Sequence, residues 1–191
     1  GDILQVVVPG IANKDEEIKR ECAGAISALV KDGLTSAESG QAAVEATQLL
    51  ADFVRRRDCT GVPPEVVSCL MEFTFPDIIS AEDLADAKRS RKSKKKKSKR
   101  KGKDERDVSR AFKEAQAVID KDTRRHQQSV VLEAMFEMYF RVLKTADAGL
   151  KAVQGHASQR RHWSQARFQK RFPLLAPTLQ GLAKFAHLIS I

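Results

Sequence analysis

The residues with the most evident chemistry form one basic run at 88–103, KRSRKSKKKKSKRKGK, which holds twelve Lys and Arg and no acid. Such a run repels itself and stays solvated until a polyanion neutralises it. Each phosphate contact releases counterions, so binding is steeply salt-dependent. Without aromatic residues, the run is suited to backbone phosphates and not to base stacking. We predict nucleic-acid contacts by its cations: Lys88, Arg89, Arg91, Lys92, Lys94, Lys95, Lys96, Lys97, Lys99, Arg100, Lys101 and Lys103.

The same run permits other interpretations. It satisfies the pattern of a nuclear localisation signal, a use that is compatible with nucleic-acid binding. It could also be a solvating loop without a partner. RNA and DNA would serve equally well as the polyanion, because only phosphates are contacted.

A second segment, 155–172, interleaves aromatic residues with five cations and no acid. Arginine forks together with stacking rings suit structured RNA, which offers both phosphates and unstacked bases. The alternative is that the aromatic residues anchor this segment to a helical body. The predicted RNA contacts here are Arg160, Arg161, Trp163, Arg167, Lys170 and Arg171.

The net charge of +9 is local to these two segments. Without 88–103 the chain carries −3, and without 155–172 as well it carries −8. The remainder is an acidic body, and with 42% apolar residues over a chain of 191 it is able to bury a core.

Motifs for catalysis are missing from the sequence. It contains no GxSxG, GxxxxGK[ST], GxGxxG or HExxH pattern, and its four His residues are scattered. The three Cys residues form no CxxC pair, which predicts free buried or half-buried thiols in a reducing compartment. No apolar run approaches the roughly 20 residues of a membrane span. We therefore expect a soluble protein without catalysis, cofactor, metal or small-molecule substrate.

The spacing of apolar residues predicts an all-α chain. A helix over 14–32, capped by Asn13, and a second apolar stripe from Ala43 to Val54 form an αα-hairpin. Only 4–8 could be a strand, and it would lack a partner. The hairpin period favours a HEAT-like helical solenoid with basic insertions. The predicted organisation is N-terminal helical repeats (1–87), a lysine-rich insertion (88–103), a long helix or helix pair (104–146), a basic and aromatic connection (147–176) and the start of a further helix near Pro177 (177–191).

Two motifs resemble a known family. FEMYFRVLK at 136–144 and LQGLAKFAHLISI at 179–191 closely resemble the paired signatures of the Noc and CCAAT-binding-factor family. The segments 21–29, 37–54 and 62–70 resemble it more loosely. The chain departs from the family in having a longer link between the two motifs, and it is expected to be a fragment that stops inside the family domain.

The resemblance implies a helical-repeat fold in the nucleolus and nucleoplasm, without catalysis. It also implies a heterodimer with nucleolar complex protein 2 and a role in assembling and exporting the precursor large-subunit ribosomal particle, with ribosomal RNA as the polyanion. Because family members are also linked to DNA replication, the alternative is a chromatin or replication-initiation adaptor. The matched positions implied to pack helices or face the partner are Phe136, Tyr139, Phe140, Leu143, Leu182, Phe185 and Leu188.

Overall fold

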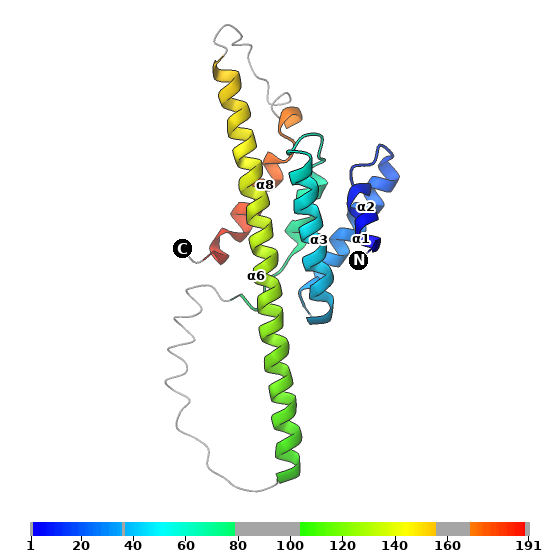
Figure 1. Ribbon diagram of the computed structural model, residues 1–191, viewed down its shortest axis with the longest axis vertical. Coiled ribbons are helices and arrows are strands. Elements are labelled where there is room, and N and C mark those ends of the chain that lie inside the picture. Colours follow the sequence, from blue (N-terminus) through cyan, green and yellow to red (C-terminus); the bar gives the residue numbers. More distant parts are fainter. Residues whose placement is uncertain (1, 36, 79–103, 156–168, 190–191) are drawn as a thin grey trace.

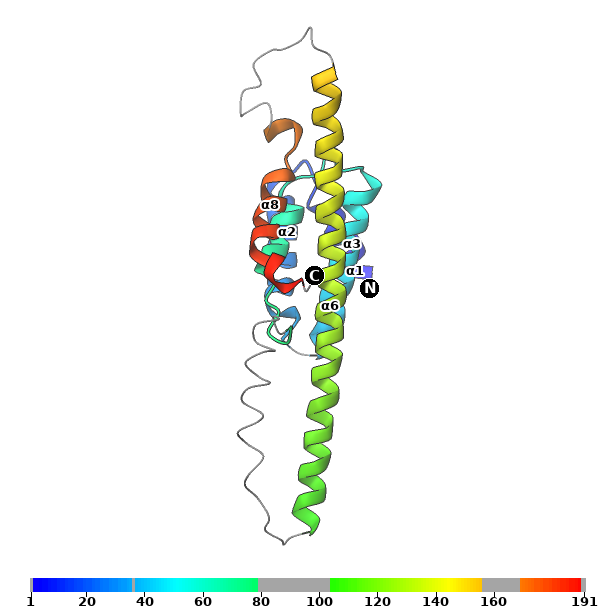
Figure 2. The same ribbon diagram turned by 90° about the vertical axis from the view of Figure 1, so that its left-hand side faces the viewer.

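The chain folds as a helical body packed along one very long helix (Figures 1 and 2). The computed structural model describes residues 2–35, 37–78, 104–155 and 169–189. No strand occurs in these ranges, so the all-α class is confirmed, whereas a HEAT-like solenoid is not. The elements are α1 (Asp2–Gly10), α2 (Glu16–Gly33), α3 (Ala37–Arg56), α4 (Glu65–Ser68), η1 (Cys69–Glu72), α6 (Asp104–Gly155), α8 (Leu175–Phe185) and η3 (Ala186–Leu188).

The first helix corrects the suggestion of a strand at 4–8. Leu4, Val7, Val8 and Ile11 have the three- and four-residue spacing of one helical face, and this face packs into the core. A lone strand would leave its backbone groups without partners, whereas a helix satisfies them internally. The three- and four-residue spacing of the apolar side chains therefore indicated the secondary structure of this segment better than its β-branched residues did.

The predicted hairpin is confirmed as α2 and α3. The capping residue differs, because α2 begins at Glu16 and the backbone N–H of Glu17 donates to Asp15 Oδ1 at 2.9 Å. Asn13 Oδ1 instead accepts a hydrogen bond from the Asp15 N–H at 3.0 Å, just before α2 begins. At the other end, a Cβ on Gly33 would lie 2.6 Å from that of Ala43, so only glycine lets the two helices approach this closely.

The segment opened by Pro63 and Pro64 contains two short elements, α4 and η1. Their buried side chains, including Val66 and Leu70, fill the space between α2 and α8. An ion pair of 3.1 Å between Lys19 Nζ and Glu65 Oε1 joins α2 to the start of α4.

The long helix α6 is continuous over 52 residues, about 78 Å at 1.5 Å per residue. Helix α6 continues to Gly155, and α8 begins at Leu175. The connection between these two helices is therefore shorter than the predicted connection over 147–176. Val131, Met135 and Tyr139 are fully buried on α6, which packs mainly on α3 and also on α8. In both ribbon views its N-terminal part extends beyond the body.

A buried polar network attaches the segment before residue 79 to α6. The Gln128 side chain is fully buried; its Oε1 accepts from the Asp77 N–H at 3.1 Å, and its Nε2 donates to Leu34 O at 3.3 Å. Arg124 Nε donates to Asp77 Oδ2 at 3.0 Å. These bonds hold three segments together next to Ile78, the last described residue before the lysine-rich run.

Replacing Gln128 by leucine should lower the free energy of unfolding by about 1–2 kcal/mol, because the Asp77 N–H and the Leu34 carbonyl would stay buried without their partner. Urea denaturation followed by circular dichroism measures this. Ser129→Ala is the matched control, since the exposed Ser129 hydroxyl bonds only to Arg125 O in its own helix. An equal effect of the two variants would contradict the role of the network.

Candidate nucleic-acid interface

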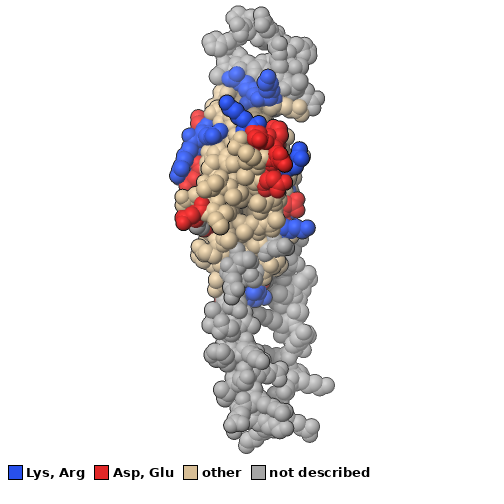
Figure 3. Space-filling view, turned by 90° about the vertical axis from the view of Figure 1, so that its right-hand side faces the viewer, with Lys and Arg blue, Asp and Glu red and all other residues tan. Residues whose placement is uncertain are grey.

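Basic side chains that are far apart in sequence gather at one end of the body. The end of α3, the last turns of α6 and the start of the 169–175 segment lie together at the upper end of Figure 1. Figure 3 shows Lys and Arg at this end, with Asp and Glu beside and below them and a mostly uncharged area in the middle of the body. We call this region the basic end; its residues are Arg55, Arg56, Arg57, Arg141, Lys144, Lys151, Lys170 and Arg171.

Three of these cations have acidic partners one helical turn away. The contacts are Arg55 with Asp52 at 2.6 Å, Arg141 with Glu137 at 3.9 Å, and Lys151 with Asp147 at 2.6 Å. Each pair lies at the surface, where such pairs contribute only about 0.3–0.5 kcal/mol. These cations are therefore able to exchange a carboxylate for a phosphate at little cost.

The loop after α3 has a fixed, strained conformation. Asp58 and Cys59 have φ of 47° and 60°, in the left-handed region that costs non-glycine residues energy. The Cys59 N–H donates to Val54 O at 3.1 Å, and Thr60 Oγ1 donates to Arg57 O at 2.6 Å. The Arg57 guanidinium carbon lies 4.6 Å from the centre of the Phe53 ring. The loop thereby holds Arg57 and turns Cys59 toward α6.

Cys59 is not suited to nucleophilic chemistry. Burial raises the pKa of its thiol, and a hydrogen bond with Thr145 opposes this only in part. Burial also raises the pKa of the Cys69 thiol to about 12. Thiolates are the reactive form, so both residues stay in the unreactive thiol form at neutral pH. The prediction of free thiols is confirmed, with Cys69 buried and Cys22 and Cys59 half-buried.

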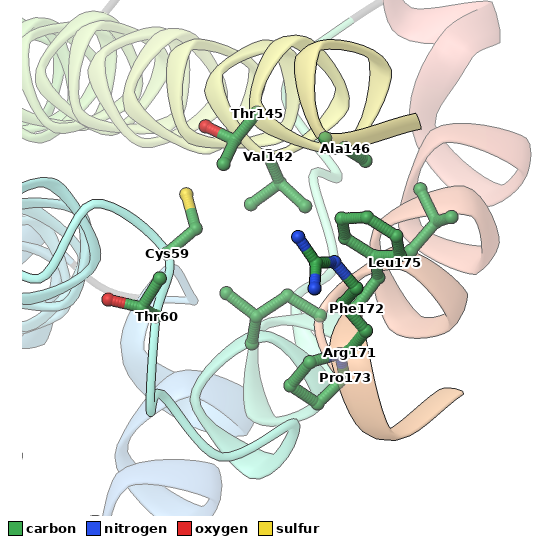
Figure 4. A pocket seen from close by; sticks show the side chains of 11 residues that line it. Cys59, Thr60, Val142, Thr145, Ala146, Arg171, Phe172, Pro173 and Leu175 are labelled. Carbon is green, nitrogen blue, oxygen red and sulfur yellow. The ribbon is translucent and has the colours of Figure 1, made fainter. Parts of the chain in front are cut away.

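A pocket of about 370 Å³ opens between this loop, α6 and the start of α8 (Figure 4). Thr145 and Val142 enter it from α6, and the Arg171 guanidinium points into the same group of side chains. Its walls are mainly apolar, and none of its lining residues is acidic. They are Cys59, Thr60, Val142, Thr145, Ala146, Gly149, Arg171, Phe172, Pro173, Leu174 and Leu175.

Of the predicted RNA-contact residues, Lys170 and Arg171 lie within the described ranges, both exposed at the basic end. The run 88–103 and the residues Arg160, Arg161, Trp163 and Arg167 lie outside the described residues. Gly155 and Gln169, between which the second basic segment runs, are both at the basic end.

Phe172 favours the anchoring alternative for its own side chain. It is half-buried, and a Cβ on Gly149 would lie 2.9 Å from Cε1 and Cζ of its ring, so the ring packs directly on α6. Sequence reasoning missed Arg55, Arg56 and Arg57, although three consecutive arginines were a usable signal.

The described ranges contain no cluster of His, Cys, Asp and Glu suited to a metal ion. Within the same ranges, no helix is sufficiently long and apolar to cross a membrane.

The two C-terminal motifs meet in space. Tyr139, from the first motif, packs against Gly181 of the second, and Phe136 and Phe140 line a groove together with Leu188 and Ile189. Of the positions that the resemblance implied to pack, Phe136, Tyr139 and Phe185 are buried, Leu143, Leu182 and Leu188 are half-buried, and Phe140 is 57% exposed.

Comparison with known proteins finds relatives of the kind that the two C-terminal motifs indicate. No family model matches the sequence. The whole chain is similar to the Nucleolar complex protein 3 homologs of Danio rerio, at 25% identity over 199 residues, and of Homo sapiens, at 26% over 199 residues. It is also similar to Nucleolar complex-associated protein 3 of Arabidopsis thaliana, at 28% over 209 residues.

The chain spans 21% of the length of the two vertebrate relatives and 24% of the plant relative. The similarity confirms the resemblance that the motifs indicate. The names of these relatives describe them as proteins of a nucleolar complex.

Proposed function

We propose that this chain is part of a non-enzymatic nucleolar scaffold that acts in assembly, ribosomal RNA processing and export of the large ribosomal subunit. The observation that carries this proposal is the similarity of the whole chain to Nucleolar complex protein 3 homologs from vertebrates and a plant. The helical body is consistent with a scaffold, because packed helices present long, rigid surfaces.

In this proposal, precursor ribosomal RNA is contacted at two separate places. The described chain ends at Ile78 before the lysine-rich run and resumes at Asp104 after it, whereas the second basic segment follows the C-terminal end of α6 in sequence. A helix of about 78 Å separates Asp104 from Gly155, so one chain would reach phosphates in two regions of a large RNA. The net negative charge of the remainder of the chain disfavours RNA contacts over most of the body.

Replacing the twelve Lys and Arg of 88–103 by Ser and Gly should reduce co-sedimentation with precursor large-subunit particles by roughly tenfold, because each lost phosphate contact removes counterion release. Its dependence on salt should become less steep for the same reason. The thermal unfolding temperature should not change, since the run carries no apolar residue for the core.

A foreign nuclear localisation signal on both chains separates RNA contact from import. Association restored fully by that signal would identify the run as an import signal alone. Unchanged association of the neutralised chain would contradict the RNA contact. Crosslinks to replication-origin DNA in place of ribosomal RNA would instead support the replication-adaptor alternative.

We further propose that the partner, nucleolar complex protein 2, docks on an apolar groove of about 470 Å³ between α6 and η3. The exposed Phe140 ring lies 6.0 Å from the ring of Phe136, and together they form a continuous apolar wall. Glu133 and Glu137 stand at its rim. An amphipathic helix with an apolar stripe and basic flanks fits both the wall and the charges. The groove is lined by Ile78, Ser129, Leu132, Glu133, Phe136, Glu137, Phe140, Leu188 and Ile189.

A further inference from the structure

We propose that the pocket at the basic end receives one unstacked base of single-stranded RNA, while the surrounding cations hold the adjoining phosphates. This inference rests on the RNA contact proposed above and adds a binding site within the described body. It differs from the contact by the lysine-rich run, which has no ring on which a base could stack.

The dimensions and walls of the pocket suit a flat aromatic group. Its volume of about 370 Å³ is within the range of small-ligand sites, which are mainly apolar with a few placed polar groups. The Phe172 ring contributes an aromatic surface, and Val142 and Leu174 contribute aliphatic ones. Gly149 keeps room for the ring, because a Cβ there would come within 2.9 Å of it.

The pocket offers few polar groups to the edge of a base. Thr60 and Thr145 are lining residues with hydroxyls, but the Thr60 hydroxyl already donates to Arg57 O, so toward a base it can only accept a hydrogen bond. Hydroxyls discriminate weakly among bases, so we expect a preference for single strands over duplexes and little preference for sequence.

The charges favour RNA over a protein side chain as the occupant. Arg171 lines the pocket and Lys170 precedes it at the surface, whereas Asp58 and Arg141 act electrostatically on the nearby Cys59 thiol in opposite directions. No lining residue is acidic. An apolar side chain of a partner would fill the cavity without using these cations, whereas a nucleotide uses the cavity and the cations together.

Two fluorescent probes of equal length test the proposal on the full chain: a short oligouridylate and the matching abasic sugar-phosphate oligomer. Anisotropy titrations should give about tenfold tighter binding of the oligouridylate, because stacking of one base contributes about 1–3 kcal/mol. Thr145→Leu, which fills the pocket, should reduce this affinity to that of the abasic oligomer. Thr145→Ser, which keeps both hydroxyl and space, should retain the difference.

A second readout protects the test from a folding defect of Thr145→Leu. In the unaltered chain at mildly alkaline pH, where part of the half-buried Cys59 thiol is deprotonated, the oligouridylate but not the abasic oligomer should slow alkylation of Cys59, measured by peptide mass spectrometry with Cys22 as the internal reference.

Equal affinities of the two probes for the unaltered chain would overturn the base pocket and leave the phosphate contact standing. Binding of neither probe at low salt would overturn the proposed RNA contact and the pocket together. If Thr145→Leu instead weakens capture of a protein partner and leaves oligouridylate binding unchanged, the pocket receives a protein side chain and the proposal is wrong.

Discussion

Replacing Gly181 by alanine should lower the free energy of unfolding by about 2–3 kcal/mol, a large cost for one methyl group. The added Cβ would lie 2.6 Å from Cζ and 2.9 Å from Cε2 of Tyr139. The Tyr139 ring is fully buried and is packed edge-on against Phe136, so it has no space into which to move. The contact joins the two C-terminal motifs, and the substitution should therefore separate α8 from α6. Urea denaturation of the full chain measures the loss.

Gly24→Ala is the matched control for this prediction. Gly24 is an exposed helical glycine in α2, and a Cβ there would meet no atom within 4 Å. Removing glycine from an open helical position stabilises a protein by about 0.5–1 kcal/mol. The two substitutions should thus shift stability in opposite directions. A stabilising effect of Gly181→Ala would show that the motifs do not depend on this close approach.

Replacing Phe140 by alanine should lower the affinity for the proposed partner, nucleolar complex protein 2, by roughly thirtyfold. A loss of this size is typical of an aromatic residue at the centre of an interface. Phe140 is 57% exposed on the groove, so its ring contributes to a docking surface more than to the core. Isothermal titration with the purified partner measures the change. The thermal unfolding temperature should stay close to that of the unaltered chain.

Ile3→Ala provides the comparison for the groove. Ile3 is 79% exposed on α1, which does not line the groove, and its removal deletes a similar exposed apolar side chain. It should leave affinity for the partner unchanged. Equal losses from both variants, or no loss from Phe140→Ala, would show that the partner docks elsewhere.

Local patterns were sufficient to predict the helical class and the α2–α3 hairpin. They did not predict the end of α6, because Gly149 in a sequence is a signal to stop a helix. In the folded chain Gly149 is needed where Phe172 packs on α6, and this contact supports the helix to Gly155. Residues 4–8, the only stretch considered able to form a strand, are helical, and the contacts of α1 with α2 and α3 bury the face that the spacing of its apolar residues indicates.

Some candidate sites could be predicted from the sequence, and others only from the structure. Both basic segments were evident from charge alone, because a run without acids is a property of neighbouring residues. The pocket and the groove were not, because each combines residues that are far apart in the chain, such as Cys59 with Phe172 and Ile78 with Phe140.

By itself, the sequence determined an all-α chain with an acidic body, two basic segments and two motifs that resemble those of the Noc and CCAAT-binding-factor family. Each of these depends on residue types and spacing over a few helical turns. Only the tertiary structure decided that Arg57, Arg141 and Arg171 share one end, and that the two motifs meet through Tyr139 and Gly181. The physical reason is that helices cross where distant side chains fit, and this fit depends on shape in three dimensions.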